Sequence, residues 1–79
     1  MSVASHPHLA VLTEQAVQIA WDYLERAGVI HDPPFCSRTL VASVEHMIQQ
    51  GERKRLLLAN RAITEYMRRL ETRTLDVAS

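Results

Sequence analysis

The stretch ERKRLLLANRAITEYMRRLETR, residues 52–73, determines most of what the sequence says about this chain. It holds seven of the nine lysines and arginines, and apolar residues recur in it at alternating spacings of three and four. That period matches the turn of an α-helix, which aligns such residues in one row. The row selected by this spacing is heptad-like and is predicted to be the buried face of a helix: Leu56, Ala59, Ile63, Tyr66 and Leu70.

Three consecutive leucines near the start of this helix do not fit on one face. Successive helix residues point about 100° apart, so Leu57 and Leu58 are expected to lie off the row to which Leu56 belongs. One interpretation is that the other helices wrap around this end of the helix. The other is that the triplet forms a second apolar surface, which contacts another subunit. Trp21, at the edge of the apolar side of an earlier helix, favours the second interpretation, because tryptophan is enriched at interfaces.

Upstream of this stretch, the chain predicts an amphipathic helix over 9–27. Its apolar residues recur every three or four positions, and its charged residues lie on the opposite side. Gly28 follows the last apolar residue, where helices commonly end with a glycine at positive φ. Residues 1–8 are predicted to be a loose leader and residues 74–79 a frayed tail.

A further helix is predicted over 37–50. Ser37 is a suitable N-cap, and Pro34 in the first turn of the helix is an alternative. The preceding Pro-Pro pair lacks two amide hydrogens, which predicts a rigid connector. Gly51 leaves two alternatives open: it ends this helix, or one helix continues over 37–73 at a cost of about 1 kcal/mol relative to alanine.

Length and charge exclude several classes of protein. Seventy-nine residues make one domain at most, and a domain of this size buries only roughly 60% of its unfolded surface, so oligomerisation is a common way to stabilise it. The formal net charge is zero, but its distribution is uneven. Residues 1–51 contain two bases and five acids, whereas residues 52–73 contain seven bases and three acids. A neutral chain lacks the field of a dedicated nucleic-acid-binding protein. The acidic first part and the basic second part complement one another, within one subunit or between two.

The sequence also predicts a cytoplasmic protein that does not cross a membrane. The first residues lack the basic start and the long apolar run of a secretory signal. No uncharged apolar stretch approaches the roughly 20 residues that span a bilayer. Cys36 is the only cysteine, so no disulfide forms within the chain.

The basic residues of 52–73 have a structural interpretation and a functional one. In the structural interpretation, ion pairs three or four positions apart stabilise a solvated helix surface. Three arginines stand at those distances from Glu65: Arg61, Arg68 and Arg69. In the functional interpretation the helix contacts phosphate groups, with five candidate residues: Arg53, Lys54, Arg55, Arg61 and Arg68.

A helix-turn-helix would supply such a nucleic-acid contact, with Gly51 in its turn. That alignment puts Met47 where the motif usually has a small residue. It also puts Asn60 where the motif has a buried aliphatic residue. The pattern therefore gives little support to this motif.

No arrangement of residues in the sequence predicts catalysis or metal binding. The four histidines, even with Cys36 added, lack the paired spacing of zinc ligands: His6, His8, His31 and His46. Cys36 beside a phenylalanine is expected to be a small buried hydrophobe. The chain has two glycines and no glycine-rich phosphate loop. We therefore expect no enzyme activity, no cofactor and no metal.

The sequence thus predicts an all-α, three-helix small domain over 9–73 that forms a homodimer. The helix over 52–73 would supply the contact between subunits, which makes the chain a protein–protein interaction, scaffold or regulatory subunit. The residues predicted at this interface lie on the first and third helices: Trp21, Leu57, Leu58, Arg61 and Arg68. The alternative function is a small nucleic-acid-binding regulator that uses the basic helix.

Overall fold

The computed structural model describes residues 7–78, with side chains described over 9–73. This part of the chain contains three helices and no strand: α1 (Pro7–Ala27), α2 (Pro33–Gln49) and α3 (Arg55–Ala78). The predicted all-α, three-helix fold is confirmed. The predicted leader falls mainly outside the described residues, and Pro7 and His8 belong to α1. At the other end, α3 runs past the predicted helix end at 73 and reaches Ala78.

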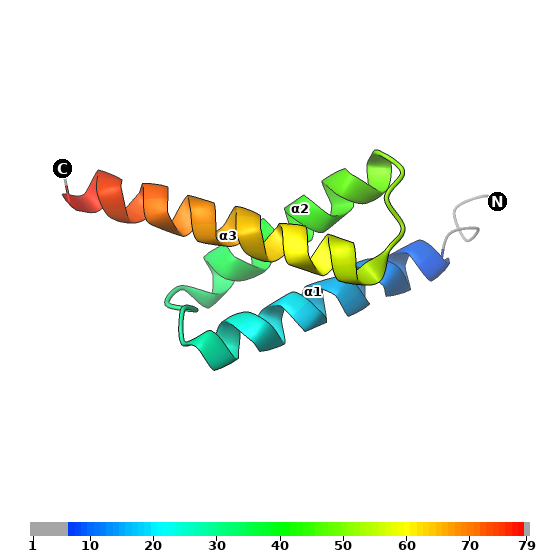
Figure 1. The fold of residues 1–79 in the computed structure, drawn as a ribbon, viewed down its shortest axis with the longest axis horizontal. Helices are drawn as coiled ribbons and strands as arrows, with labels where there is room; N and C mark the ends of the chain where they lie inside the picture. The colour runs from blue at the N-terminus through cyan, green and yellow to red at the C-terminus, as the bar shows by residue number, and fades with distance from the viewer. Residues whose placement is uncertain (1–6, 79) are drawn as a thin grey trace.

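The helices pack so that each one contacts the other two. Figure 1 shows α1 and α3 running in the same direction, while α2 runs in the opposite direction. The C-terminal part of α3 extends past the turn that joins α1 to α2. This arrangement leaves two seams along α3, one shared with α1 and one shared with α2.

The core is formed by one row of buried side chains from each helix, at spacings near the helical period. These rows are Ala16, Ala20 and Leu24 of α1; Cys36, Leu40, Val44 and Ile48 of α2; and Leu58, Ala59, Ala62 and Tyr66 of α3. The alanines of α1 and α3 are small, which permits these two helices to approach one another closely. Larger side chains from all three helices fill the space that remains, led by Tyr66, Leu24, Leu40 and Leu58.

α2 begins earlier than the sequence predicted, and Ser37 is not its N-cap. Asp32 has an extended backbone (φ −134°, ψ 90°), and its Oδ1 accepts a hydrogen bond from the Phe35 amide at 3.3 Å, which makes it the N-cap. Pro33 and Pro34 take the first two helical positions, where an amide hydrogen would have no partner within the helix. The predictions of Ser37 as cap and of a Pro-Pro connector are wrong, and the alternative of a proline in the first turn is confirmed.

Both glycines end a helix in the same way. Gly28 has a φ of 73° and Gly51 a φ of 103°, a backbone region that favours glycine. In each case the glycine amide and the next amide bond back to the last helical turn, which is the pattern of a Schellman motif. The four bonds are Gly28 to Glu25 (3.1 Å), Val29 to Leu24 (3.3 Å), Gly51 to Ile48 (3.0 Å) and Glu52 to Met47 (3.0 Å). The predicted helix end at Gly28 is confirmed, and residues 50–54 separate α2 from α3.

The leucine triplet is oriented differently from the prediction. Leu58 is completely buried, Leu57 is half-buried and Leu56 is 65% exposed, so the buried row does not begin at Leu56. The reason is that α3 lies against two helices at once, and its buried face points between them. Small residues, Ala59 and Ala62, occupy the centre of that face. The sequence pattern follows the larger apolar residues, so it places the buried face of α3 too close to Leu56.

Replacing Asp32 with alanine should lower the melting temperature at neutral pH, because Asp32 caps α2 and its Oδ2 bonds Arg73 at 3.0 Å. The Phe35 amide and the Arg73 guanidinium hold the pKa of Asp32 below its ordinary value of 3.8. As the pH falls, the unfolded chain binds the proton first, so the stability due to Asp32 is present above pH 3.8 and is lost below it. The difference in melting temperature between wild type and variant should therefore shrink in strongly acidic buffer, which thermal melts over a pH series measure.

Asp32→Asn is the matched control for this experiment, because asparagine caps a helix but forms no ion pair with Arg73. Its melting temperature at neutral pH should lie between those of the wild type and the alanine variant. Equal melting temperatures for the wild type and the alanine variant at neutral pH would contradict the role of Asp32.

Candidate functional site

The five residues predicted at an interface have different surroundings in the structure. Leu58 belongs to the core and is inaccessible to a second molecule in this fold. Trp21 and Leu57 are half-buried, and Trp21 packs against the core. Arg61 and Arg68 are exposed on α3. Spacing puts Leu57 and both arginines on one flank of α3, so the structure brings three of the five together.

The large exposed apolar side chains of the described residues lie on α1 and α3. They are Val11 at 47%, Tyr23 at 57%, Leu56 at 65% and Met67 at 40% exposed. Val11, Ile19 and Tyr23 share one row of α1, because multiples of four separate them. The remaining member of the row is Gln15, whose Oε1 accepts a hydrogen bond from Arg55 of α3 at 3.0 Å. This row therefore borders α3.

A matching row lies on the flank of α3 that faces α1. Its members follow the helical period: Leu56, Ile63, Met67 and Leu70. Arg61 lines a groove with α2, so it marks the opposite flank. A residue two positions from Arg61 points about 200° away from it, which places Ile63 on the α1 side. Ile63 and Leu70 are half-buried against the core, whereas Leu56 and Met67 are more exposed.

Two hydrogen bonds connect α1 and the turn that follows it to α3. Gln15 bonds a residue 40 positions later, and the Tyr66 hydroxyl donates to the Val29 carbonyl, 37 positions earlier, at 2.6 Å. Since α1 and α3 run in the same direction, as Figure 1 shows, these bonds join the two helices near both ends of their shared seam. We term the combined feature the α1–α3 surface: Val11, Ile19, Tyr23, Leu56, Ile63, Met67 and Leu70. The sequence showed the spacing of these residues, but not that the two rows would flank the same seam.

A shallow hollow opens at the Val11 end of the α1–α3 surface. Its volume is about 650 Å³, and its lining is mainly apolar: Leu9, Val11, Leu12, Gln15 and Arg53. The Arg53 guanidinium is held near this end of the molecule by Nη1, which donates to the Ile48 carbonyl at 2.7 Å. The hollow therefore combines an apolar wall with one cation.

The ion pairs among the described residues involve two carboxylates, Glu65 of α3 and Asp32 of the α1–α2 turn. Glu65 bonds both Arg68 and Arg69, and Asp32 bonds Arg73. Arg69 and Arg68 hold the pKa of Glu65 below its usual range. The predicted pairs of Glu65 with Arg68 and Arg69 are confirmed, whereas a pair with Arg61 is absent from the described residues. Within 9–73, no carboxylate of α1 takes part in an ion pair, and Asp22 accepts a hydrogen bond from Gln18 of the same helix at 2.8 Å.

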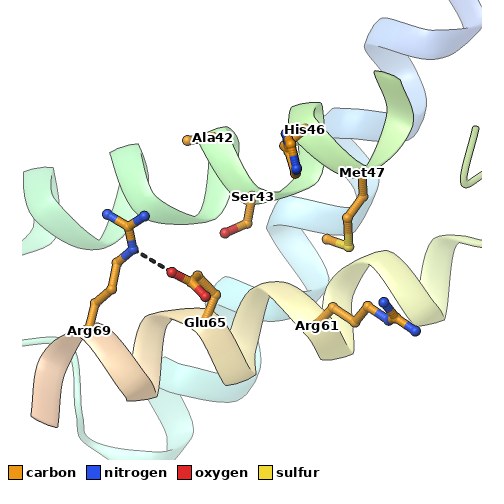
Figure 2. Close-up of a pocket in the computed structure, with 7 residues that line it drawn as sticks. All are labelled: Ala42, Ser43, His46, Met47, Arg61, Glu65 and Arg69. Atoms are coloured by element: carbon orange, nitrogen blue, oxygen red, sulfur yellow. Dashed lines mark hydrogen bonds and ion pairs between the residues drawn. The ribbon is translucent and has the colours of Figure 1, made fainter. Parts of the chain in front are cut away.

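A groove of about 560 Å³ runs along the other seam, between α2 and α3. Its lining is Ala42, Ser43, His46 and Met47 of α2 and Arg61, Glu65 and Arg69 of α3. Figure 2 shows Ser43 and Met47 pointing from α2 toward α3, and Glu65 and Arg69 pointing back toward α2. We term this feature the α2–α3 groove. The sequence singled out Arg61 but not its neighbours on α2, because their proximity depends on how the two helices pack.

Tyr66 ties the core to the turn between α1 and α2. Besides the hydrogen bond from its hydroxyl to Val29, its ring lies 5.9 Å from the Phe35 ring, and the Arg73 guanidinium lies 4.3 Å from the centre of the Phe35 ring. Burial raises the pKa of the Tyr66 hydroxyl and that of the Cys36 thiol. Cys36 is fully buried, which confirms the prediction of a small buried hydrophobe.

In the described part of the chain, no three His, Cys, Asp or Glu side chains are grouped so that they could hold a metal ion. His6 lies outside the described residues, and so does the side chain of His8. None of the described helices is both long enough and apolar enough to cross a bilayer. Comparisons with protein-family models, curated proteins and solved structures find no match for this chain.

Proposed function

We propose that this chain is a cytoplasmic helical interaction protein, a scaffold or regulatory subunit, that forms a homodimer through the α1–α3 surface. The observation that carries the proposal is the exposure of large apolar side chains along one seam, led by Leu56 at 65% and Tyr23 at 57%. Single exposed apolar residues are normal on a monomer, but rows that neighbouring helices share are typical of interaction sites.

The charges favour a second copy of the chain as the partner. α1 contains three acids and one arginine, whereas Arg53 lines the hollow beside Val11 and Arg55, the first residue of α3, bonds Gln15 of the α1 row. In a two-fold symmetric dimer, α1 of each subunit can meet α3 of the other, so the complementary charges are used twice. Burial of apolar surface between two copies would also stabilise a domain of this small size.

Two-fold symmetry also provides a place for Tyr23. This residue stands at one end of the α1 row, and the apolar hollow beside Val11 lies at the other end. When two such rows pack in opposite directions, Tyr23 of one subunit reaches the hollow of its partner. The Arg53 guanidinium at the edge of the hollow can then pack against the tyrosine ring.

The substitution Leu56→Asp tests this dimer, because it places a charge at the most exposed apolar position without touching the core. We expect wild type at twice the subunit mass of 9.0 kDa and the variant at 9.0 kDa in light scattering. The dissociation constant of the dimer should rise at least about 30-fold, as for an interface hot spot. Circular dichroism should show unchanged helix content in the variant.

Ser37→Asp is the matched control, since it adds the same charge at an exposed position of α2. It should leave the dimer intact, and the dimer should persist at high salt because apolar contact drives it. A wild type that stays monomeric at high concentration would overturn the proposal. Binding to duplex DNA that weakens steeply with salt would favour the nucleic-acid regulator instead.

A further inference from the structure

The α2–α3 groove is separate from the proposed dimer surface, because it lies on the opposite flank of α3. It continues into a smaller hollow of about 270 Å³ lined by Met47, Gln50, Gly51, Glu52 and Arg61. Met47 and Arg61 line both, so the two form one trough along the seam. Its volume lies within the range of natural ligand sites, which is about 300–1,000 Å³.

Small side chains on α2 create the space. Ser43 points toward α3 where a larger residue would narrow the seam, and the longer Met47 side chain forms the apolar part of the wall. The Ser43 hydroxyl and the His46 imidazole add two groups that form hydrogen bonds with a ligand. The α2 wall therefore carries no carboxylate, lysine or arginine.

The α3 wall supplies two guanidinium groups with free donors. Arg61 has no ion-pair partner among the described residues. Arg69 uses Nε to bond Glu65, as Figure 2 shows, and its two terminal nitrogens have no partner in the described part of the chain. Glu65 is shared by Arg68 and Arg69, so its charge is offset within α3. The trough is thus suited to carboxylate groups, which guanidinium binds through paired hydrogen bonds.

The spacing of these arginines indicates the form of the ligand. Arg61 and Arg69 are eight residues apart, so their Cα atoms are separated by about 12 Å along the helix axis. An extended peptide covers about 13 Å in four residues. Glu52 and Glu65 alternate with the arginines along the trough, which disfavours a continuous polyanion such as nucleic acid. We propose that the α2–α3 groove binds an extended acidic peptide segment of a partner protein, with carboxylates four residues apart meeting Arg61 and Arg69.

The test uses two synthetic ten-residue peptides and the isotopically labelled protein in NMR titrations. One peptide carries glutamates four positions apart in a serine–leucine background, and the other carries glutamines at the same positions. The glutamate peptide should shift the amide signals of residues 42–47 and 61–69 and leave those of 11–20 unchanged. Arg61→Gln should weaken binding about fivefold, the effect of losing one exposed charge pair. Arg26→Gln, at an exposed position of α1, should bind as the wild type does.

Three results would overturn the proposal. They are no shift with the glutamate peptide at millimolar concentration, equal binding of the glutamine peptide, and the same shifts from duplex DNA. Arg61 is exposed and unpaired among the described residues, so the Arg61→Gln variant should stay folded, which circular dichroism checks. This outcome is independent of the dimer, because Leu56→Asp should bind the peptide as the wild type does.

Discussion

Leu58→Ala should destabilise the protein by about 2–5 kcal/mol, the usual range for removing a buried leucine side chain. Leu58 is completely buried between the helices, so its truncation leaves a cavity that the neighbouring rows only partly fill. A domain of 79 residues has a total stability of only about 4–12 kcal/mol. We therefore expect much or all of the folded state to be lost at physiological temperature, as measured by urea unfolding followed by circular dichroism.

Leu56→Ala is the matched control, because it makes the same chemical change two positions away at a side chain that is 65% exposed. Its effect on the folded subunit should stay within about 0.5 kcal/mol, as for most surface substitutions. The comparison must be made at a concentration where both proteins are monomeric, since Leu56 is also part of the proposed dimer surface. If Leu56→Ala lost more unfolding free energy than Leu58→Ala, the heptad-like row that begins at Leu56 would be the buried face instead.

Tyr66→Ala should cost about 3–5 kcal/mol, comparable with the loss of other large buried aromatic side chains. Tyr66 is the largest fully buried side chain, and its hydroxyl bonds the Val29 carbonyl. The substitution therefore removes a core ring and the tie between α3 and the α1–α2 turn together. Calorimetric or urea-induced unfolding of the purified variant would measure this loss.

Tyr66→Phe separates the two contributions, because it keeps the ring and removes the hydroxyl. It should cost about 1–2 kcal/mol, since the Val29 carbonyl loses its donor but is only half-buried. Burial raises the pKa of Tyr66 above its ordinary value of 10.0, so the unfolded chain releases the phenolic proton first. Wild type should therefore lose stability as the pH rises above 10.0, and Tyr66→Phe should lose less. An alanine variant no less stable than the phenylalanine variant would show that the ring contributes nothing to the core.

Local rules predicted the number of helices and some of their ends. Gly28 ends α1 because a residue at positive φ completes the hydrogen bonds of the last turn, and those bonds involve only its immediate neighbours. The pairs of Glu65 with Arg68 and Arg69 were likewise predictable from spacing within one turn. The start of α2 has two sequence-based alternatives, and the one with a proline in the first turn is correct because that turn needs no amide hydrogens.

The candidate sites were predictable only in part. Arg61 and Arg68 were named from the basic stretch, and both are exposed on α3. Tyr23 and Met67 were missed, because nothing local to either residue shows that its neighbours in space leave it uncovered. The α2–α3 groove was missed for the same reason, since Ser43 and Arg69 face each other only after the helices pack.

The sequence by itself determined that three segments are helical, that Gly28 ends the first of them and that basic charge gathers on the third. These properties depend on contacts within one or two turns of the same helix. Only the tertiary structure decided that Leu58 is buried and Leu56 exposed, and which side chains border each seam of α3. The physical reason is that the buried face of a helix is set by the positions of its neighbours, and α3 has two neighbours whose small and large side chains together decide its rotation.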